Sequence, residues 1–286
     1  MKLYVHVQHG LCNRLRALMS GMALSYVSGR EFVLIWEKDI HCECLFSDLF
    51  DDSGFTVYDN LNNIDNFNNM TIYNYMENEI NPSKTKYIEY NESNVSKDIY
   101  VKSAYVLENK EINWKLENSM FCKLKIKKDI RCKIKKYDKS LLIKRCIGFH
   151  IRSQKPDNNK KNAYDSSKNW TKESHKKINY WRDITSLNRF IPLMDDLIKK
   201  NIEVRFFIST DEEKNIKDLK EKYGNRVCFI ERNKFDRSKE QIEDALIDLV
   251  LLSKCRNIYG SFWSSYSEVA HRISDKAKMK YCGVDF

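Results

Sequence analysis

The chain has 286 residues, 42% of them hydrophobic and 31% charged, a balance that favours a globular protein and excludes an intrinsically disordered one. Two domains of about 140 residues are the natural division of that length. The net charge is +10, the first ten residues alternate as a strand does, and no apolar run reaches the roughly 18 residues of a membrane span, so we expect a cytoplasmic protein without a secretion signal.

The N-terminal sequence is typical of a β-α-β unit. Alternation and helical spacing predict a strand at 3–8, a helix at 13–27 that Gly29 ends, and a strand at 31–36. Between residues 51 and 111 the chain is rich in Asn, Asp and Tyr. Only short β-like pieces, at 56–58 and 100–107, are predicted there.

A strongly basic segment follows. Residues 123–145 hold eleven Lys or Arg against Asp129 and Asp138, and apolar residues recur there at helical spacing, which predicts an amphipathic helix with a solvated basic face. We place the domain boundary here, giving domains 1–140 and 141–286. The basic face suits an anionic substrate or a crossing between domains. A nucleic-acid-binding protein stays open as the alternative, although no RNA-binding signature accompanies the segment.

The C-terminal half alternates between strands and helices, which predicts a doubly wound parallel sheet. A long polar stretch, 153–180, is expected as a functional or mobile loop. The predicted elements are strands at 146–151, 204–209, 226–230 and 256–259, and helices at 187–200, at 212–223, in the apolar run that ends near Cys255, and from Ser264 onward.

Ligands of open α/β sheets bind beyond the carboxyl ends of the strands, so the residues just after strands are the candidates for a site. Arg152 is placed to grip a phosphate bidentately. Ser265 and Glu268 are spaced as a capping box, which opens either a diphosphate-binding helix terminus or an ordinary helix. Asp211 suits a ribose, a guanine or a helix cap, and Asp248, inside an apolar helix, is expected to have a partner or to face a cleft.

Four segments, GLCNRLRAL, IGFHIR, FFISTD and DLVLLSKCRNIYGSFWSSYS, resemble the α1,6-, α1,2- and protein O-fucosyltransferase superfamily in content and order. The resemblance implies an α/β fold of the GT-B type, with two Rossmann-like domains facing a central cleft. It also implies an acceptor-side N-terminal domain and a C-terminal domain that binds the donor, typically GDP-fucose. No cofactor and no metal are expected, and the partners implied are the nucleotide-sugar and a glycan or protein acceptor.

The resemblance also implies roles for single residues. Arg152 matches the arginine that holds the β-phosphate, with Ser153 standing where many relatives have a second arginine. The other residues implied in donor binding are His150, Ser264, Ser265 and Tyr266 near the diphosphate and nucleoside, Asp211 and Asp248 near the nucleoside, and Gly10, Asn13 and Arg14 in the loop after the first strand.

The expected reaction is inverting transfer of a sugar to a hydroxyl group, stabilised by Arg152 and the helix terminus at Ser264. The sequence does not single out the general base: His9 and Asp157 are the catalytic candidates beside Arg152, and Glu37 and Asp39 stay open. His150 is either a ligand or a structural histidine. A transferase for another nucleotide-sugar and a catalytically silent sugar-binding relative are the nearest alternatives.

Overall fold

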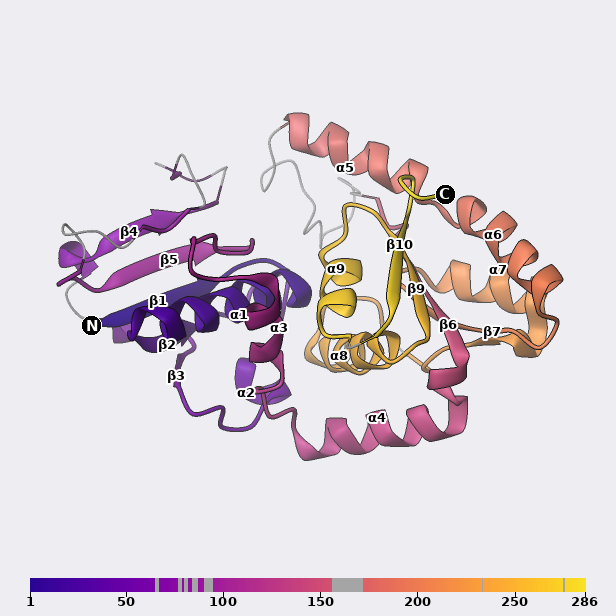
Figure 1. Cartoon of the computed structure of the whole chain (residues 1–286), viewed down its shortest axis with the longest axis horizontal. Helices are drawn as coiled ribbons and strands as arrows, with labels where there is room; N and C mark the ends of the chain where they lie inside the picture. Colours follow the sequence, from indigo (N-terminus) through magenta and orange to yellow (C-terminus); the bar gives the residue numbers. More distant parts are fainter. Residues whose placement is uncertain are drawn as a thin grey trace. The chain divides into compact units, whose positions relative to one another are not determined.

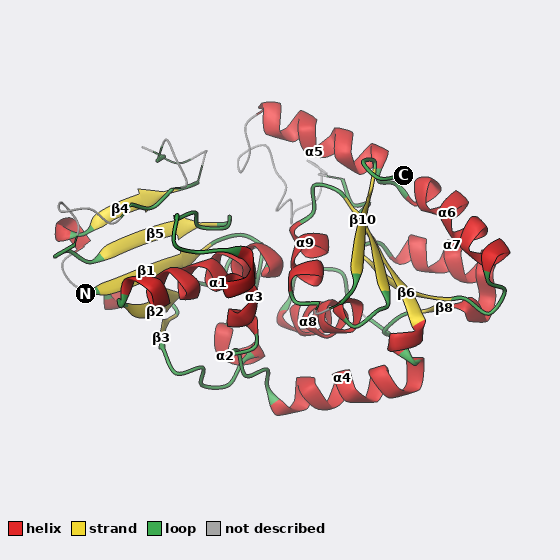
Figure 2. Ribbon diagram, viewed as in Figure 1, coloured by secondary structure: helices red, strands yellow, loops and turns green. Residues whose placement is uncertain are grey.

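The computed structural model describes residues 1–64, 67–76, 79, 82–83, 87–89, 95–155, 172–232, 234–274 and 276–286. The chain divides into two compact units, Met1–Lys127 and Lys128–Phe286 (Figure 1). Each unit contains one parallel sheet flanked by helices, as the colouring by secondary structure shows (Figure 2). The predicted α/β class with two Rossmann-like domains is confirmed.

The first unit is built on a five-stranded sheet of order β3-β2-β1-β5-β4, in which all pairs are parallel. Its strands are β1 (Lys2–Val7), β2 (Glu31–Ile35), β3 (Thr56–Tyr58), β4 (Thr71–Asn74) and β5 (Ile99–Ser103). Its helices are α1 (Leu11–Ser28), α2 (Phe46–Leu49) and α3 (Trp114–Phe121), with 3-10 turns at Leu61–Asn63 and Phe67–Asn69. The order reverses between β1 and β5, which makes that pair the switch point of the sheet.

The second unit has the sheet order β10-β9-β6-β7-β8, again all parallel. Its strands are β6 (Cys146–Ile151), β7 (Arg205–Thr210), β8 (Val227–Cys228), β9 (Asn257–Ser261) and β10 (Lys278–Cys282). Its helices are α4 (Lys128–Leu141), α5 (Lys172–Ile184), α6 (Leu187–Lys200), α7 (Glu213–Tyr223), α8 (Lys239–Ser253) and α9 (Ser265–Arg272), with 3-10 turns at Ile143–Arg145 and Gly224–Arg226. Its switch point lies between β6 and β9.

The side chains of β6 alternate between the two faces of this sheet, as the pleat requires. Phe149 and Ile151 join Phe190 of α6 in a buried cluster. The opposite face carries Gly148, where an added Cβ would meet the Leu252 side chain of α8 at 2.6 Å. His150 shares the face of Gly148, so the pleat directs it toward the α8 and α9 side of the sheet.

The boundary between the units lies at 127–128, not near residue 140. The basic helix α4 belongs to the second unit because Ile130 and Ile134 are buried and Lys254, just after α8, pairs with Asp138 at 2.8 Å. The expected amphipathic helix is confirmed, with its lysines on the exposed side. The predicted polar loop at 153–180 is wrong at its C-terminal end, where α5 begins at Lys172.

Three findings concern metal sites, disulfides and membrane-spanning helices in the described part of the chain. Among the described residues no group of His, Cys, Asp and Glu is arranged to hold a metal ion. All nine cysteines fall within the described ranges, and none of them forms a disulfide. No helix in the described ranges has the length and apolar character needed to cross a bilayer.

Candidate active site

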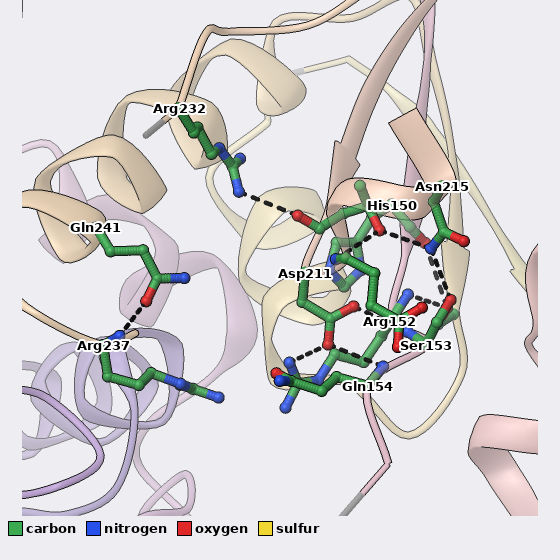
Figure 3. A network of polar contacts seen from close by, with 12 residues as sticks. His150, Arg152, Ser153, Gln154, Asp211, Asn215, Arg232, Arg237 and Gln241 are labelled. Carbon is green, nitrogen blue, oxygen red and sulfur yellow. Dashed lines mark hydrogen bonds and ion pairs between the residues drawn. The ribbon is translucent and has the colours of Figure 1, made fainter. Parts of the chain in front are cut away.

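The polar residues expected to bind a ligand in the second unit gather at the carboxyl ends of β6, β7 and β9. Figure 3 shows Arg152, Asp211 and His150 close together, with Ser153 and Gln154 on the turn that leaves β6. Ser261, the last residue of β9, accepts a hydrogen bond through Oγ from the Arg152 N–H at 2.9 Å. The cluster therefore sits at the switch point between β6 and β9, where open α/β sheets bind their ligands.

Asp211 organises this cluster. Its carboxylate pairs with the Arg152 guanidinium and accepts the backbone N–H groups of Ser153 (2.9 Å) and Gln154 (3.1 Å). Burial alone would raise the pKa of Asp211, but Arg152 and the Ser153 N–H hold it below its ordinary value. Asp211 thus orients the arginine and the turn. It does not cap α7, whose N-cap is Glu212.

Asn215 is a residue of this cluster that the sequence did not reveal. Its Nδ2 donates to Ser153 Oγ at 2.8 Å and to Thr210 Oγ1 at 2.9 Å. It lies in α7 and is buried, and so joins the end of β7 to the turn after β6. Ser153 is thereby held as part of the scaffold.

His150 is a buried, neutral histidine. Burial lowers its pKa to about 3. The Ser267 hydroxyl donates to the Ser261 carbonyl at 3.0 Å, so His150 Nδ1, 2.7 Å from that hydroxyl, carries the proton and donates to Ser267 Oγ. The Tyr266 ring stacks on the imidazole with centroids 4.7 Å apart, and its hydroxyl donates to Ala245 O at 2.8 Å. His150 thus has a structural role at the base of the site.

The N-terminus of α9 adjoins these residues through Tyr266 and Ser267. The predicted capping box is wrong: Ser264 is the N-cap residue, its side chain makes no cap hydrogen bond, and Glu268 pairs with Arg272 at 3.3 Å. Ser264 and Ser265 are half-buried beside N–H groups that carry the positive end of the helix dipole. An anion is therefore favoured at this terminus, next to the cluster around Arg152.

Asp248 has a partner, as expected, and its place near a nucleoside stays a prediction. It is fully buried and pairs with Arg232, whose Nη1 donates to the Thr210 carbonyl at 3.0 Å. Arg232 follows β8. No sequence pattern marks it as part of the site, because its partner Asp248 lies sixteen residues further along the chain, in α8. The pair joins α8 to the end of β7, so the buried Asp248 stabilises the strand end that carries the site.

The loop after β1 forms a separate cluster in the first unit. His9 has a left-handed backbone (φ 64°), whereas Gly10 has an ordinary extended one (φ −70°), so the loop does not depend on glycine. Arg14 is buried and donates to the carbonyls of His9 and Glu37, both at 2.6 Å, and to Asp39 at 2.9 Å. The geometry makes Arg14 a clamp on two loops, and its role in donor binding stays a prediction.

Three further predicted residues are Asn13, His9 and Asp157. Asn13 lies half-buried in the first turn of α1. Burial, with His41 as the next contribution, lowers the pKa of His9 to about 3, which makes this imidazole a weak proton acceptor. Asp157 lies outside the described residues. The structure thus brings Arg152, His150, Asp211 and the Ser264–Tyr266 segment together in one unit, and His9, Gly10 and Arg14 together in the other.

We expect Gly260→Ala to lower the free energy of unfolding by about 2–3 kcal/mol, because overpacking a tight contact has costs of this order. An added Cβ would meet Ser267 Oγ at 2.5 Å and Ser267 Cβ at 2.8 Å. Gly148→Ala is the matched control, since its Cβ would meet the flexible end of Leu252, and about 1 kcal/mol is expected. Urea unfolding measures both. Equal losses would show that the contact with Ser267 is loose.

Comparison with known proteins places the fold. No protein-family model and no curated protein sequence matches the chain. Solved structures do match: the NodZ α1,6-fucosyltransferase soaked with GDP-fucose has a TM-score of 0.65 at 14% identity over 96% of this chain and 94% of its own. The Arabidopsis thaliana FUT1 mutant in complex with GDP has a TM-score of 0.57 at 14% sequence identity, and the match covers 97% of this chain and 70% of that one. POFUT1 in complex with GDP-fucose has a TM-score of 0.56 at 11% sequence identity, and the match covers 99% of this chain and 98% of that one. The chain therefore has the GT-B fold of the fucosyltransferases.

Proposed function

We propose that the protein is an inverting glycosyltransferase that moves fucose from GDP-fucose to a hydroxyl group of a glycan or protein. The observation that carries the proposal is the Arg152–Asp211 clamp beside the N-terminus of α9, at the switch point of the second sheet. A guanidinium and a row of helix N–H groups form an anion site, and the fold is shared with proteins solved with GDP and GDP-fucose.

In the proposed reaction the acceptor oxygen forms a bond to the anomeric carbon while the bond from that carbon to the diphosphate breaks on the opposite side. Negative charge grows on the leaving diphosphate. Because Asp211 fixes the turn and the guanidinium in advance, Arg152 stabilises that charge with little reorganisation, and the α9 terminus adds its dipole. These groups supply the positive charge, so the proposed reaction requires no metal ion.

Isothermal titration with GDP, UDP and GDP-fucose in EDTA, repeated with Mg²⁺, tests the proposal. We expect GDP and GDP-fucose to bind equally well with and without the metal, and UDP to bind much more weakly. UDP binding instead of GDP binding would favour a transferase for another nucleotide-sugar. The absence of any nucleotide binding would contradict the donor site itself.

Arg152→Ala is expected to weaken GDP binding by about 10-fold to 100-fold, the equivalent of the roughly 1.5–3 kcal/mol of a charge-assisted hydrogen bond. Arg256→Ala is the matched control, because Arg256 is exposed and precedes β9, at the opposite edge of the sheet. It should leave GDP affinity unchanged at moderate salt. An unchanged affinity in the Arg152 variant, with the fold intact by circular dichroism, would remove Arg152 from the site.

The basic helix α4 is the observation behind the alternative of a nucleic-acid-binding protein. Its lysines lie on the exposed side, and Asp138 is neutralised by Lys254. Binding through such a face would weaken steeply with salt and ignore GDP. Titration with a short RNA duplex at two salt concentrations therefore separates this alternative from the transferase.

A further inference from the structure

The second unit exposes a tryptophan beside its anion site. Trp263 lies on the turn between β9 and α9, directly before Ser264, the N-cap residue of α9. It is 45% exposed, although tryptophan is highly buried on average in folded proteins. An open aromatic surface thus lies next to the helix N–H groups that favour an anion.

The backbone of Trp263 is left-handed. Its φ is 57°, a conformation that bulky residues rarely adopt and that glycine adopts without strain. The turn from β9 into α9 therefore has a tryptophan where backbone conformation alone favours glycine. Strained residues of this kind cluster at ligand sites, because there the side chain has a use that offsets the strain.

Helix α5 supports the exposed ring. The Trp181 ring lies nearly parallel to that of Trp263, with an interplanar angle of 8° and centroids 6.5 Å apart. Trp181 is half-buried and packs on Phe262, with 4.6 Å between the ring centroids. Phe262 in turn contacts Tyr281 of β10 at 5.6 Å. This row of aromatic side chains orients the exposed ring before a ligand binds.

The same helix adjoins the anion site. Lys155, on the turn that leaves β6, pairs with Asp183 of α5. Burial acts to raise the pKa of Asp211, Arg152 acts most strongly to lower it, and the buried Arg182 of α5 adds to that lowering. The exposed tryptophan therefore lies between α5 and the start of α9, two segments that both border the anion site. All of these residues belong to the second unit.

The chemistry of the exposed ring indicates its ligand. The face of an indole carries partial negative charge and attracts groups of partial positive charge. Lys177 shows this attraction, since its Nζ lies 4.3 Å from the centroid of the Trp263 ring. The C–H groups on one face of a sugar ring form an apolar surface with partial positive charge, while the hydroxyls at the rim reach water. Lys177 is exposed and its contact is weak, so a sugar ring displaces it easily.

We propose that Trp263 is the residue on which the sugar of the donor stacks. This inference rests on the proposed function. The sugar of a nucleotide-sugar is bonded to its diphosphate, so it has to lie beside the anion site, where Trp263 presents its ring. The nucleoside and the diphosphate contact other groups. Trp263 therefore contributes to the affinity for GDP-fucose and not to the affinity for GDP.

Isothermal titration of Trp263 variants with GDP and with GDP-fucose tests this role. Trp263→Gly removes the ring and suits the left-handed backbone, so the turn is retained. We expect this variant to bind GDP-fucose about 10-fold more weakly, because the stacking contact is lost, and to bind GDP as the wild type does. Trp263→Phe keeps an aromatic face and should stay within about threefold of the wild type for both ligands.

Trp114→Phe is the matched control. Trp114, the first residue of α3, is 50% exposed, so its exposure is close to that of Trp263. Its substitution should change neither affinity. Tryptophan fluorescence adds a direct readout of the contact, because a sugar that stacks on an indole alters its emission. GDP-fucose should change the emission of the wild type more than GDP does, and Trp263→Phe should abolish that difference while Trp114→Phe retains it.

The outcomes separate the two proposals. A wild-type protein that does not bind GDP-fucose contradicts the proposed function. If the wild type binds GDP-fucose but Trp263→Gly retains the full affinity for it, the stacking role alone is overturned. Equal losses of affinity for GDP and GDP-fucose in Trp263→Gly also overturn it, because they show that the substitution disturbs the anion site and not a sugar contact.

Discussion

Leucine in place of Asp248 is expected to lower the free energy of unfolding of the second unit by about 3–5 kcal/mol, because it leaves a buried arginine without its counter-charge. Asp248 is fully buried, and the Arg232 side chain is only 8% exposed. The second bond of Arg232, to the Thr210 carbonyl, fixes the guanidinium, so the unpaired charge has no route to solvent. Arg232→Met should cost a similar amount, since it strands the carboxylate instead.

Urea denaturation followed by far-UV circular dichroism measures these losses. The double variant Arg232→Met with Asp248→Leu should regain most of the stability, because buried pairs exchanged for apolar side chains are often neutral. Lys217→Met is the control: its pair with Glu213 is 71% and 63% exposed, and less than about 1 kcal/mol is expected. A loss of that small size at Asp248 would mean that water reaches the pair.

The protein is expected to lose about 2 kcal/mol of unfolding free energy per buried histidine as the pH falls from 7 to 5. The pKa of His6 and of His150 is lowered from 6.5 to about 3 by burial. Between these values the unfolded chain binds protons that the folded chain does not, so stability rises with pH there. The contribution is fully present above pH 6.5 and is lost as the pH falls toward 3.

Urea midpoints at half-unit steps from pH 7 to pH 5 measure this slope, in a window above the ordinary range of carboxyl groups. His150→Gln should flatten the pH dependence of the second unit while lowering its stability at pH 7. A wild-type slope of zero would show that the two imidazoles bind protons as readily in the folded state as in the unfolded chain, and would contradict their lowered pKa.

Elements with a strong apolar pattern could be predicted from the sequence to the residue. Strand β6 and helix α6 have the predicted bounds, because one is a short apolar run and the other has regular helical spacing. Helix α5 was missed, since Ile178 and Arg182 are its only buried residues within a lysine-rich segment. Strand β10, at the edge of its sheet, was missed because lysines occupy two of its five positions, 278 and 280, and Lys276 precedes it.

The residues of the site that directly follow strands could be predicted from the sequence. Arg152, Asp211 and the start of α9 follow strands, so a topological rule places them at one edge. The partnerships among them could not be predicted, because they depend on which side chain reaches which. Arg232 and Asn215 join segments far apart in the chain, and no local pattern marks them.

The contacts that build the cluster around Arg152 and Asp211 also bear on how the protein folds. His150 meets Ser267 across 117 residues, and Arg152 meets Ser261 across 109. Closing loops of that length costs entropy before any contact repays it, so such pairings form late and slowly. The parallel ladder between β6 and β9 closes the same loop. The cluster therefore assembles when β9 pairs with β6 and completes the sheet. Before that pairing the chain contains every residue of the site, but they are not brought together.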